Sequence, residues 1–224
     1  MNTFDIRQNV GASVLAIAAV FATSAAAETF SFDFDSGLPA GFSGAGSTTA
    51  VLGLSGINGF DGDMLVSSTD AILSLSGLAA HGTVSVSFGF AAINSWDGPD
   101  GGYSPDYFNM EADGVEQFQI SADNTGGLPD VPSTATDESL GEYYGGGYRE
   151  SVYTVSLSFA HSGSSLTLDF FADGAGWQGG ADEFWAIDNL VVTTDATPAV
   201  PLPAGLPLLA GGIAAFGLLR RPRT

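Results

Sequence analysis

The sequence predicts an all-β domain built as a two-sheet antiparallel β-sandwich. Hydrophobic and polar residues alternate with a period of two in many short segments, as in strands that bury one face. No window between residues 28 and 198 keeps a sustained helical period, and Gly and Ser interrupt the segments. About eight or nine short strands of this kind favour two sheets that share one core.

The expected strands follow this alternation along the chain. Phe30, Phe32 and Phe34 share one face of the first, with polar residues between them. The other long alternations cover residues 84–90, 153–159 and 166–170. Shorter candidates are residues 64–66, 72–75, 107–112, 117–120 and 185–193.

Residues that favour turns and loops lie between these strands. Asp113-Gly114 lies between two apolar segments and predicts a tight hairpin. Residues 94–106 are too rich in Gly, Pro and Asp for a strand, and residues 121–150 read as a long polar connection. Loops of this length in a compact domain are usually functional or disordered.

Residues 1–27 have the pattern of a secretory signal peptide. Arg7 precedes an apolar run over residues 14–21, and Ala25-Ala26-Ala27 supplies the small residues of a cleavage site before Glu28. We therefore expect an exported domain over residues 28–198. It contains no cysteine, so its stability must come from burial and from any bound metal rather than from disulfides.

We predict that the C-terminal segment, residues 199–224, is a targeting signal and not part of the folded domain. An apolar stretch over residues 205–219 ends in Arg220-Arg221-Pro222-Arg223. Residues 202–219 are just long enough to cross a bilayer as a short helix, with the arginines on the cytoplasmic side. The motif that precedes the stretch is Val200, Pro201, Leu202, Pro203 and Ala204.

This order of motif, apolar helix and arginine cluster resembles the VPLPA variant of the PEP-CTERM sorting signals of Gram-negative bacteria. The resemblance implies an exosortase-type transpeptidase as a partner, which cuts near residues 200–204 and passes the protein to the envelope or to exopolysaccharide. The precursor would be anchored transiently in the inner membrane. An ordinary tail anchor is the alternative interpretation.

The domain itself is similar to many secreted proteins of the PEP-CTERM type. The similarity rests on SWDG at residues 95–98, PDYF at 105–108 and the closing block at 182–190, with shorter matches at 151–153 and 159–162. Phe184 stands where the closing block often has Ser. The resemblance covers roughly residues 73–194 and implies a jelly-roll-like sandwich.

The domain is strongly acidic. Of five basic residues only Arg149 lies in it, and of 25 acidic residues only Asp5 lies outside it, which leaves 24 negative charges against one positive. This charge excludes nucleic acid and anionic lipid as partners. The repulsion among carboxylates also calls for a saline medium, for bound cations, or for both.

Clustered acidic residues predict a calcium site. Calcium takes six to eight oxygen ligands, several from carboxylates and others from carbonyls in glycine-rich turns. The spacing does not match an EF-hand. Asp182 and Asp188 are an even number of residues apart and would share one face of an unbroken strand. The candidate ligands are Asp97, Asp100, Asp106, Asp182, Glu183 and Asp188.

Aromatic residues in glycine-rich segments indicate a second kind of site, a platform of flat rings that binds carbohydrate beside the ion. We expect Trp185 to lie in the core and Trp96 to pack under its own loop. The aromatic residues that we assign to the platform are Trp177, Tyr143, Tyr144 and Tyr148.

The sequence contains no recognisable catalytic constellation. His81 and His161 are the only histidines, and no Gly-x-Ser-x-Gly elbow is present. Two histidines without cysteine supply too few ligands for zinc. A pair of catalytic carboxylates, as in a glycoside hydrolase, remains an alternative, because the distance between residues on different strands cannot be read from the sequence. Glutamates available for one are Glu111, Glu138, Glu142 and Glu183.

Taken together, the sequence predicts a non-enzymatic, exported β-sandwich, stabilised by calcium and retained at the cell surface or in exopolysaccharide. A carbohydrate-binding module is the first alternative. A secreted glycoside hydrolase is the second.

Overall fold

The computed structural model describes residues 26–100, 102–196, 209 and 211–213. Residues 26–196 lie within one compact unit, and the short helical piece at 209 and 211–213 belongs to a second. The predicted signal peptide and sorting signal fall almost wholly outside the described residues. Among the described residues, no helix is long and apolar enough to cross a membrane.

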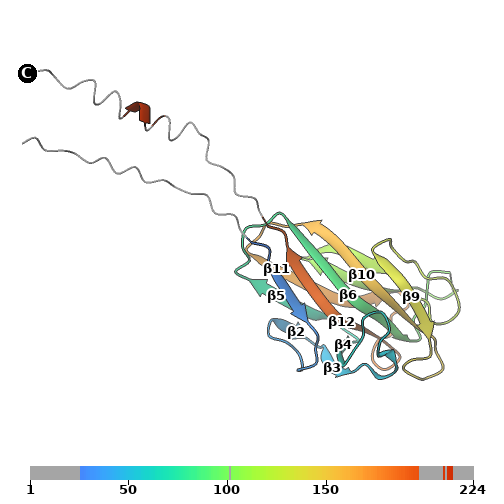
Figure 1. Ribbon diagram of the computed structural model, residues 1–224. Coiled ribbons are helices and arrows are strands. Elements are labelled where there is room, and N and C mark those ends of the chain that lie inside the picture. The colour runs from blue at the N-terminus through green and yellow to red at the C-terminus, as the bar shows by residue number, and fades with distance from the viewer. Residues whose placement is uncertain (1–25, 101, 197–208, 210, 214–224) are drawn as a thin grey trace, which may run out of the picture. The chain divides into compact units, whose positions relative to one another are not determined.

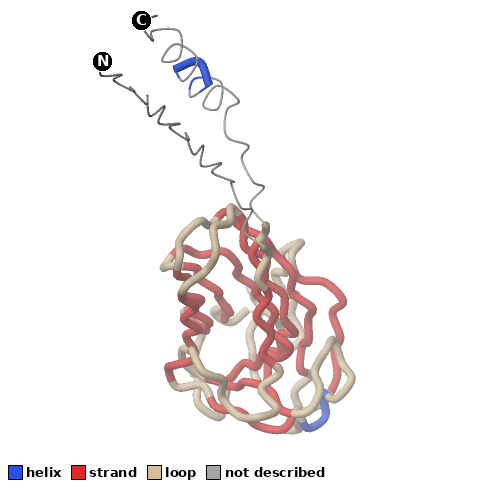
Figure 2. Tube along the Cα trace, turned by 60° about the vertical axis from the view of Figure 1, so that its left-hand side comes forward, coloured by secondary structure: helices blue, strands red, loops and turns tan. Residues whose placement is uncertain are grey.

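The domain consists of two antiparallel sheets that face one another (Figures 1 and 2). Sheet A has the order β3 (Ser47–Ala50), β4 (Asp63–Ser67), β12 (Glu183–Thr194), β6 (Thr83–Asn94), β10 (Glu150–Ala160) and β9 (Ala135–Gly141), and β1 (Thr29–Phe32) also pairs with β12. Sheet B has the order β2 (Phe42–Gly44), β5 (Ala71–Ser76), β11 (Ser165–Gly174), β7 (Asp106–Ala112) and β8 (Val115–Ile120). A short 3-10 helix, η1, covers Leu52–Leu54.

Successive strands cross between the two sheets. β4, β6, β10 and β12 belong to sheet A, whereas β5, β7, β8 and β11 belong to sheet B. With β12 between β4 and β6, and β11 between β5 and β7, this is the strand order of a jelly roll. The predicted all-β sandwich is therefore confirmed.

The predicted hairpin is also present. Asp113 and Gly114 connect β7 to β8 with φ values of 51° and 76°, as a two-residue turn of this type requires. Three strands, β2, β3 and β9, were not expected from the sequence. All three lie at sheet edges, and edge strands that bury little need no alternation of apolar residues.

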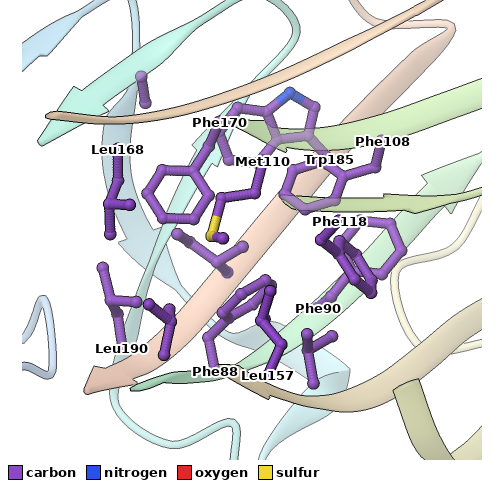
Figure 3. Packing of buried hydrophobic residues seen from close by; sticks show 14 of the residues in the cluster. Phe88, Phe90, Phe108, Met110, Phe118, Leu157, Leu168, Phe170, Trp185 and Leu190 are labelled. Carbon is purple, nitrogen blue, oxygen red and sulfur yellow. The ribbon is translucent and has the colours of Figure 1, made fainter. Parts of the chain in front are cut away.

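The main core lies between the sheets and is rich in aromatic rings. Phe90 of sheet A stacks on Phe108 of sheet B, with ring centroids 4.4 Å apart. Phe88 makes edge contacts with Phe108, Phe118 and Phe170. Figure 3 shows these side chains directed toward one another between the strands. This interior holds the two sheets together.

A second, smaller core covers the outer face of sheet A. Ala91, Ile93, Val152 and Ala186 alternate with inward-facing residues on their strands. The segment after β3 covers them, with Leu54 and Phe60 fully buried. Sheet A is therefore buried on both faces here. All buried hydrophobic residues of both clusters lie between residues 34 and 192, so the domain carries its own core.

Candidate metal centre

Four loops meet at one end of the sandwich, and we call this region the loop end. They connect β6 to β7, β8 to β9, β9 to β10, and β11 to β12. Their ranges are 95–105, 121–134, 142–149 and 175–182. Glycine, proline and aspartate in these segments prevent them from continuing as strands, so the chain turns here several times. Five of the six acidic residues that the sequence singled out lie at the loop end; the sixth, Asp188, lies within β12.

Asp97 and Asp106 hold one another in place. The Asp106 N–H donates to the carbonyl oxygen of Asp97 at 2.9 Å, and the Asp97 N–H donates to Asp106 Oδ2 at 2.8 Å. The Thr125 hydroxyl donates to Asp97 Oδ1 at 3.0 Å. Asp106 is the first residue of β7 and is fully buried, and Asp97 is only 8% exposed. Sheet B and the loop after β6 therefore place these two carboxylates side by side.

Glu183 brings the third carboxylate from sheet A. It is the first residue of β12 and is fully buried. The Gln178 N–H donates to Glu183 Oε2 at 2.7 Å, which fixes the side chain against the loop that precedes the strand. The cluster therefore joins the ends of two strands in opposite sheets.

The side chains beneath the cluster are aromatic. Trp96 is fully buried and donates its indole N–H to the Phe184 carbonyl oxygen at 2.9 Å. The Trp177 ring packs edge-on against it, with centroids 5.2 Å apart. A fourth carboxylate, Asp123, accepts the N–H group of Gly98 and three N–H groups of its own loop, including that of Gly126. These contacts fix the loops around the cluster.

The three carboxylates lie close enough to share an ion. One oxygen each from Asp97, Asp106 and Glu183 lies within 4.8 Å of the others. Two ligands on opposite sides of a calcium ion, each about 2.4 Å from it, are separated by the same distance. Asp106 Oδ1 is buried and receives no hydrogen bond from the described residues. Buried acceptors in proteins almost always have a partner, so this oxygen calls for one.

The backbone next to Asp106 Oδ1 admits only glycine. A Cβ at Gly176 would lie 3.1 Å from this oxygen and would overlap the carbonyl oxygen of Ser104. Because Gly176 has no side chain, the carboxylate oxygen and the Ser104 carbonyl oxygen can both lie against the backbone of this residue. Carbonyl oxygens in glycine-rich turns are ligands that calcium uses.

The electrostatics of the cluster favour a positive partner. Burial, together with the negative charges of Glu183, Asp97 and Asp182, raises the pKa of Asp106 to about 7, although the hydrogen bond from the Asp97 N–H acts in the opposite direction. Burial also raises the pKa of Glu183, with Asp182 and Asp97 adding to the effect. Two unit charges 4.8 Å apart repel by about 3 kcal/mol at an effective dielectric constant of about 20. A proton or a cation must therefore offset this repulsion.

The remaining predicted ligands lie elsewhere or at the margin. Asp100 is exposed in the loop 95–105, and no described contact joins it to the cluster. Asp182 is exposed beside the cluster, and its carbonyl oxygen accepts the backbone N–H of Ser95. The structure thus brings together three of the six predicted residues, Asp97, Asp106 and Glu183.

Asp188 has its own surroundings on β12. Glu183 lies five residues before it, or about 16 Å along a strand. Asp188 is fully buried, and its oxygens accept the N–H groups of Asp61 and Asn189. Burial, with a contribution from the charges of Asp35 and Asp33, raises its pKa to about 6 against the lowering effect of these hydrogen bonds. The strand is not the unbroken one expected, because β12 begins after Asp182 and its pairing with β6 shifts register after Asp188.

The predicted carbohydrate residues divide between packing and a pocket. Tyr143 and Tyr144 contact the smaller core, where Tyr144 lies edge-on to Phe184. Trp177 packs against Trp96, as described above. Tyr148 lines a polar pocket of about 350 Å³ at the loop end.

The same pocket contains residues that the sequence did not single out. Tyr103, Thr125 and Gln178 line it together with Ser95, Asp97 and Asp182. They lie on different loops, so no local spacing in the sequence connects them. The glycine and aspartate content of the loops was the only signal available.

Comparisons with known proteins give no family for this chain. No protein-family model matches it, and no curated protein matches it. Its fold is similar to part of latent PorU from Porphyromonas gingivalis, with 12% identity over 80% of this chain and a TM-score of 0.42. It is also similar to part of a family GH115 4-O-methyl-α-glucuronidase, with 13% identity over 85% of the chain and a TM-score of 0.38.

A third similarity is to an exo-β-1,3-galactanase from Phanerochaete chrysosporium, with 12% identity over 76% of this chain and a TM-score of 0.35. The matches span 13%, 20% and 29% of those three chains, so each concerns a part of a larger protein. At these TM-scores, they assign neither an activity nor a ligand to this chain.

Proposed function

We propose that this β-sandwich is a non-enzymatic, exported protein of the cell surface or exopolysaccharide that holds one structural calcium ion. The ion would bind Asp97, Asp106 and Glu183 and tie β7 of sheet B to β12 of sheet A. The observation that carries this proposal is the buried Oδ1 of Asp106, which has no hydrogen-bond partner in the part of the chain that the structure describes and lies in a group of three carboxylates.

The chemistry of the cluster favours a hard cation. Every side-chain ligand is a carboxylate oxygen, the donor type that calcium prefers over thiolate or imidazole. Among the described residues, the one contact at ion-pair distance joins His161 to Asp113, so no lysine or arginine side chain neutralises the cluster. An external cation would supply that charge.

Export and sorting form the second half of the proposal. The predicted signal peptide at residues 1–27 and the motif at residues 200–204 support it, and the resemblance to VPLPA-type signals supplies the exosortase-type partner. Mass spectrometry of the cell-associated protein tests this half, because it reads both ends of the mature chain. A chain that still begins at Met1 and ends at Thr224 would contradict it.

Thermal unfolding tests the calcium ion. The domain of residues 28–198 should melt higher in calcium than in EDTA. At free calcium 100-fold above Kd the gain is about 2.7 kcal/mol, or about 5–10 °C for a domain of this size. Equal melting temperatures in the two buffers would refute the proposal.

Asp106→Asn sharpens this test. In EDTA the variant should melt at or above the wild type, because it removes a buried charge that its neighbours repel. In calcium it should lose most of the gain, because a ligand is missing. Asp100→Asn, an exposed acid of the same loop, is the matched control and should keep the full gain. Loss of stability in both buffers alike would indicate a packing role for Asp106 instead.

A further inference from the structure

The polar pocket at the loop end opens beside the carboxylate cluster. All four loops contribute to its walls, and Asp97 belongs both to the pocket and to the cluster. Its volume, about 350 Å³, is in the range of small-molecule sites. A ligand in this pocket would therefore lie next to the ion that we propose.

The cluster alone does not complete a calcium shell. One oxygen from each of three carboxylates supplies half or fewer of the six to eight ligands that calcium takes. Asp106 and Glu183 are fully buried, whereas Asp97 faces the pocket. The open side of the shell is therefore the pocket side, where oxygens of water or of a ligand enter.

The pocket walls combine aromatic rings with hydrogen-bonding groups. Tyr103 is 67% exposed, although large aromatic side chains are usually more buried than this. Tyr148 is half-buried on the facing loop. The Gln178 amide and the Thr125 hydroxyl add polar groups. Rings that present a flat apolar face beside hydrogen-bonding groups suit a sugar, which has both C–H faces and hydroxyls.

Charge narrows the ligand class further. Asp97 and Asp182 line the pocket, and no lysine or arginine does. An anionic glycan would meet these carboxylates and the net negative charge of the domain. A neutral sugar has no such cost, and a pair of adjacent hydroxyls supplies two oxygens to a cation.

We infer that this pocket binds a neutral glycan through adjacent hydroxyls that coordinate the calcium ion, with Tyr103 and Tyr148 against the sugar ring. The inference rests on the proposed calcium site. Asp97 links the two, since it holds the ion and forms part of the pocket wall.

Binding to polysaccharides in the presence and absence of calcium tests the inference. The probes are mannan, galactan and glucan as neutral polymers and alginate as an anionic one, measured by affinity electrophoresis or calorimetry. We expect binding to at least one neutral polymer in calcium, none in EDTA, and none to alginate.

Two variants distinguish the effect on glycan binding from the effect on calcium binding. Tyr103→Ala should weaken glycan binding by about tenfold or more, the usual effect of truncating an exposed aromatic contact. It should leave the calcium-dependent rise in melting temperature unchanged. Leu128→Ala, which alters an exposed residue of a neighbouring loop outside the pocket, should change neither.

The outcomes distinguish this inference from the calcium site. A calcium-dependent rise in melting temperature without binding to any neutral polymer overturns the inference and leaves the ion in place. Binding that persists in EDTA or in Tyr103→Ala also overturns it, because the sugar would then lie elsewhere. Failure of both measurements refutes the calcium site as well.

Discussion

The carboxylates at the two ends of the sandwich differ in their hydrogen-bond partners. At the end where β1 begins and β12 finishes, which we call the terminal end, Glu28 accepts the Ala79 N–H at 2.8 Å. Asp195 accepts the N–H groups of Gly82 and Thr83 at 2.7 and 2.8 Å. At the loop end, three carboxylates converge, and a buried oxygen of Asp106 has no partner among the described residues.

The two histidines also lie at the terminal end. His81 Nε2 lies 2.7 Å from His161 Nδ1, and His161 Nε2 lies 3.2 Å from Asp113 Oδ2. The terminal-end carboxylates of Glu28 and Asp195 thus accept hydrogen bonds from backbone N–H groups of the chain itself. The contrast teaches that net charge alone does not call for a cation, because an acidic group that accepts backbone N–H groups is already satisfied. What calls for a cation is a set of carboxylates that outnumbers its donors.

The largest expected effect comes from the aromatic layer under the cluster. Trp96→Ala should cost about 3–5 kcal/mol, since it removes a fully buried ring and its hydrogen bond to Phe184. It should also abolish the calcium response, because Asp97 is the next residue. Leu78→Ala, in the buried turn at the terminal end, should cost about 2–5 kcal/mol and keep that response. Urea unfolding with and without calcium measures both. A Trp96→Ala protein that keeps the calcium response would contradict the difference between the two ends.

A smaller effect is the pH dependence of the metal-free protein. The pKa of Asp106 is about 7 in the folded protein against an ordinary value of 3.8, and that of Asp188 is about 6. Between about pH 4 and pH 7 the folded state therefore holds protons that the unfolded state has lost. Stability should fall as pH rises through this window.

Calcium should reverse part of this trend. The ion displaces the proton from Asp106, so its stabilising effect should be larger at pH 8 than at pH 5.5. Melting temperatures at the two pH values, in calcium and in EDTA, measure the difference. Asp106→Asn should flatten the EDTA profile but leave the contribution of Asp188. A calcium effect that does not change with pH would argue against Asp106 as a ligand.

The smallest effect is expected at the terminal end. Hydrogen bonds from Gly82 and Thr83 lower the pKa of Asp195, so its contribution to stability is present at neutral pH and is lost as pH falls through the lowered pKa. Asp195→Asn should lower the melting temperature slightly at pH 7, equally with and without calcium. The difference from the wild type should vanish in acid. A calcium-dependent effect at this site would show that the two ends are not independent.

Much of the fold could be predicted from the sequence. β6 and β10 bury a single face over residues 83–87 and 154–160, and the alternation that results is visible in the residue order. The hairpin at Asp113-Gly114 was visible because positive φ values restrict the residues that fit. Strand β9 escaped prediction because it lies at a sheet edge, where polar residues are tolerated.

The site was only partly predictable. Asp97 and Asp106 share one loop, and Glu183 begins the last strand, so their residue types and turn contexts pointed to them. Asp188 lies close to Glu183 in sequence but, by strand geometry, far along β12, and sequence spacing alone does not show this. Tyr103 and Gln178 could not be found, because they meet only where separate loops converge.

At the terminal end, the first and last strands of the domain lie side by side. The Thr194 N–H donates to the Glu28 carbonyl oxygen at 2.9 Å, and Thr29 pairs with Thr193, so the first and last strands enter and leave together. Glu183 lies at the other end of β12, about 36 Å away along the strand. Any segment that continues the chain beyond either end of the domain would therefore join it at the terminal end, at the opposite end of β12 from the pocket that we propose for a glycan.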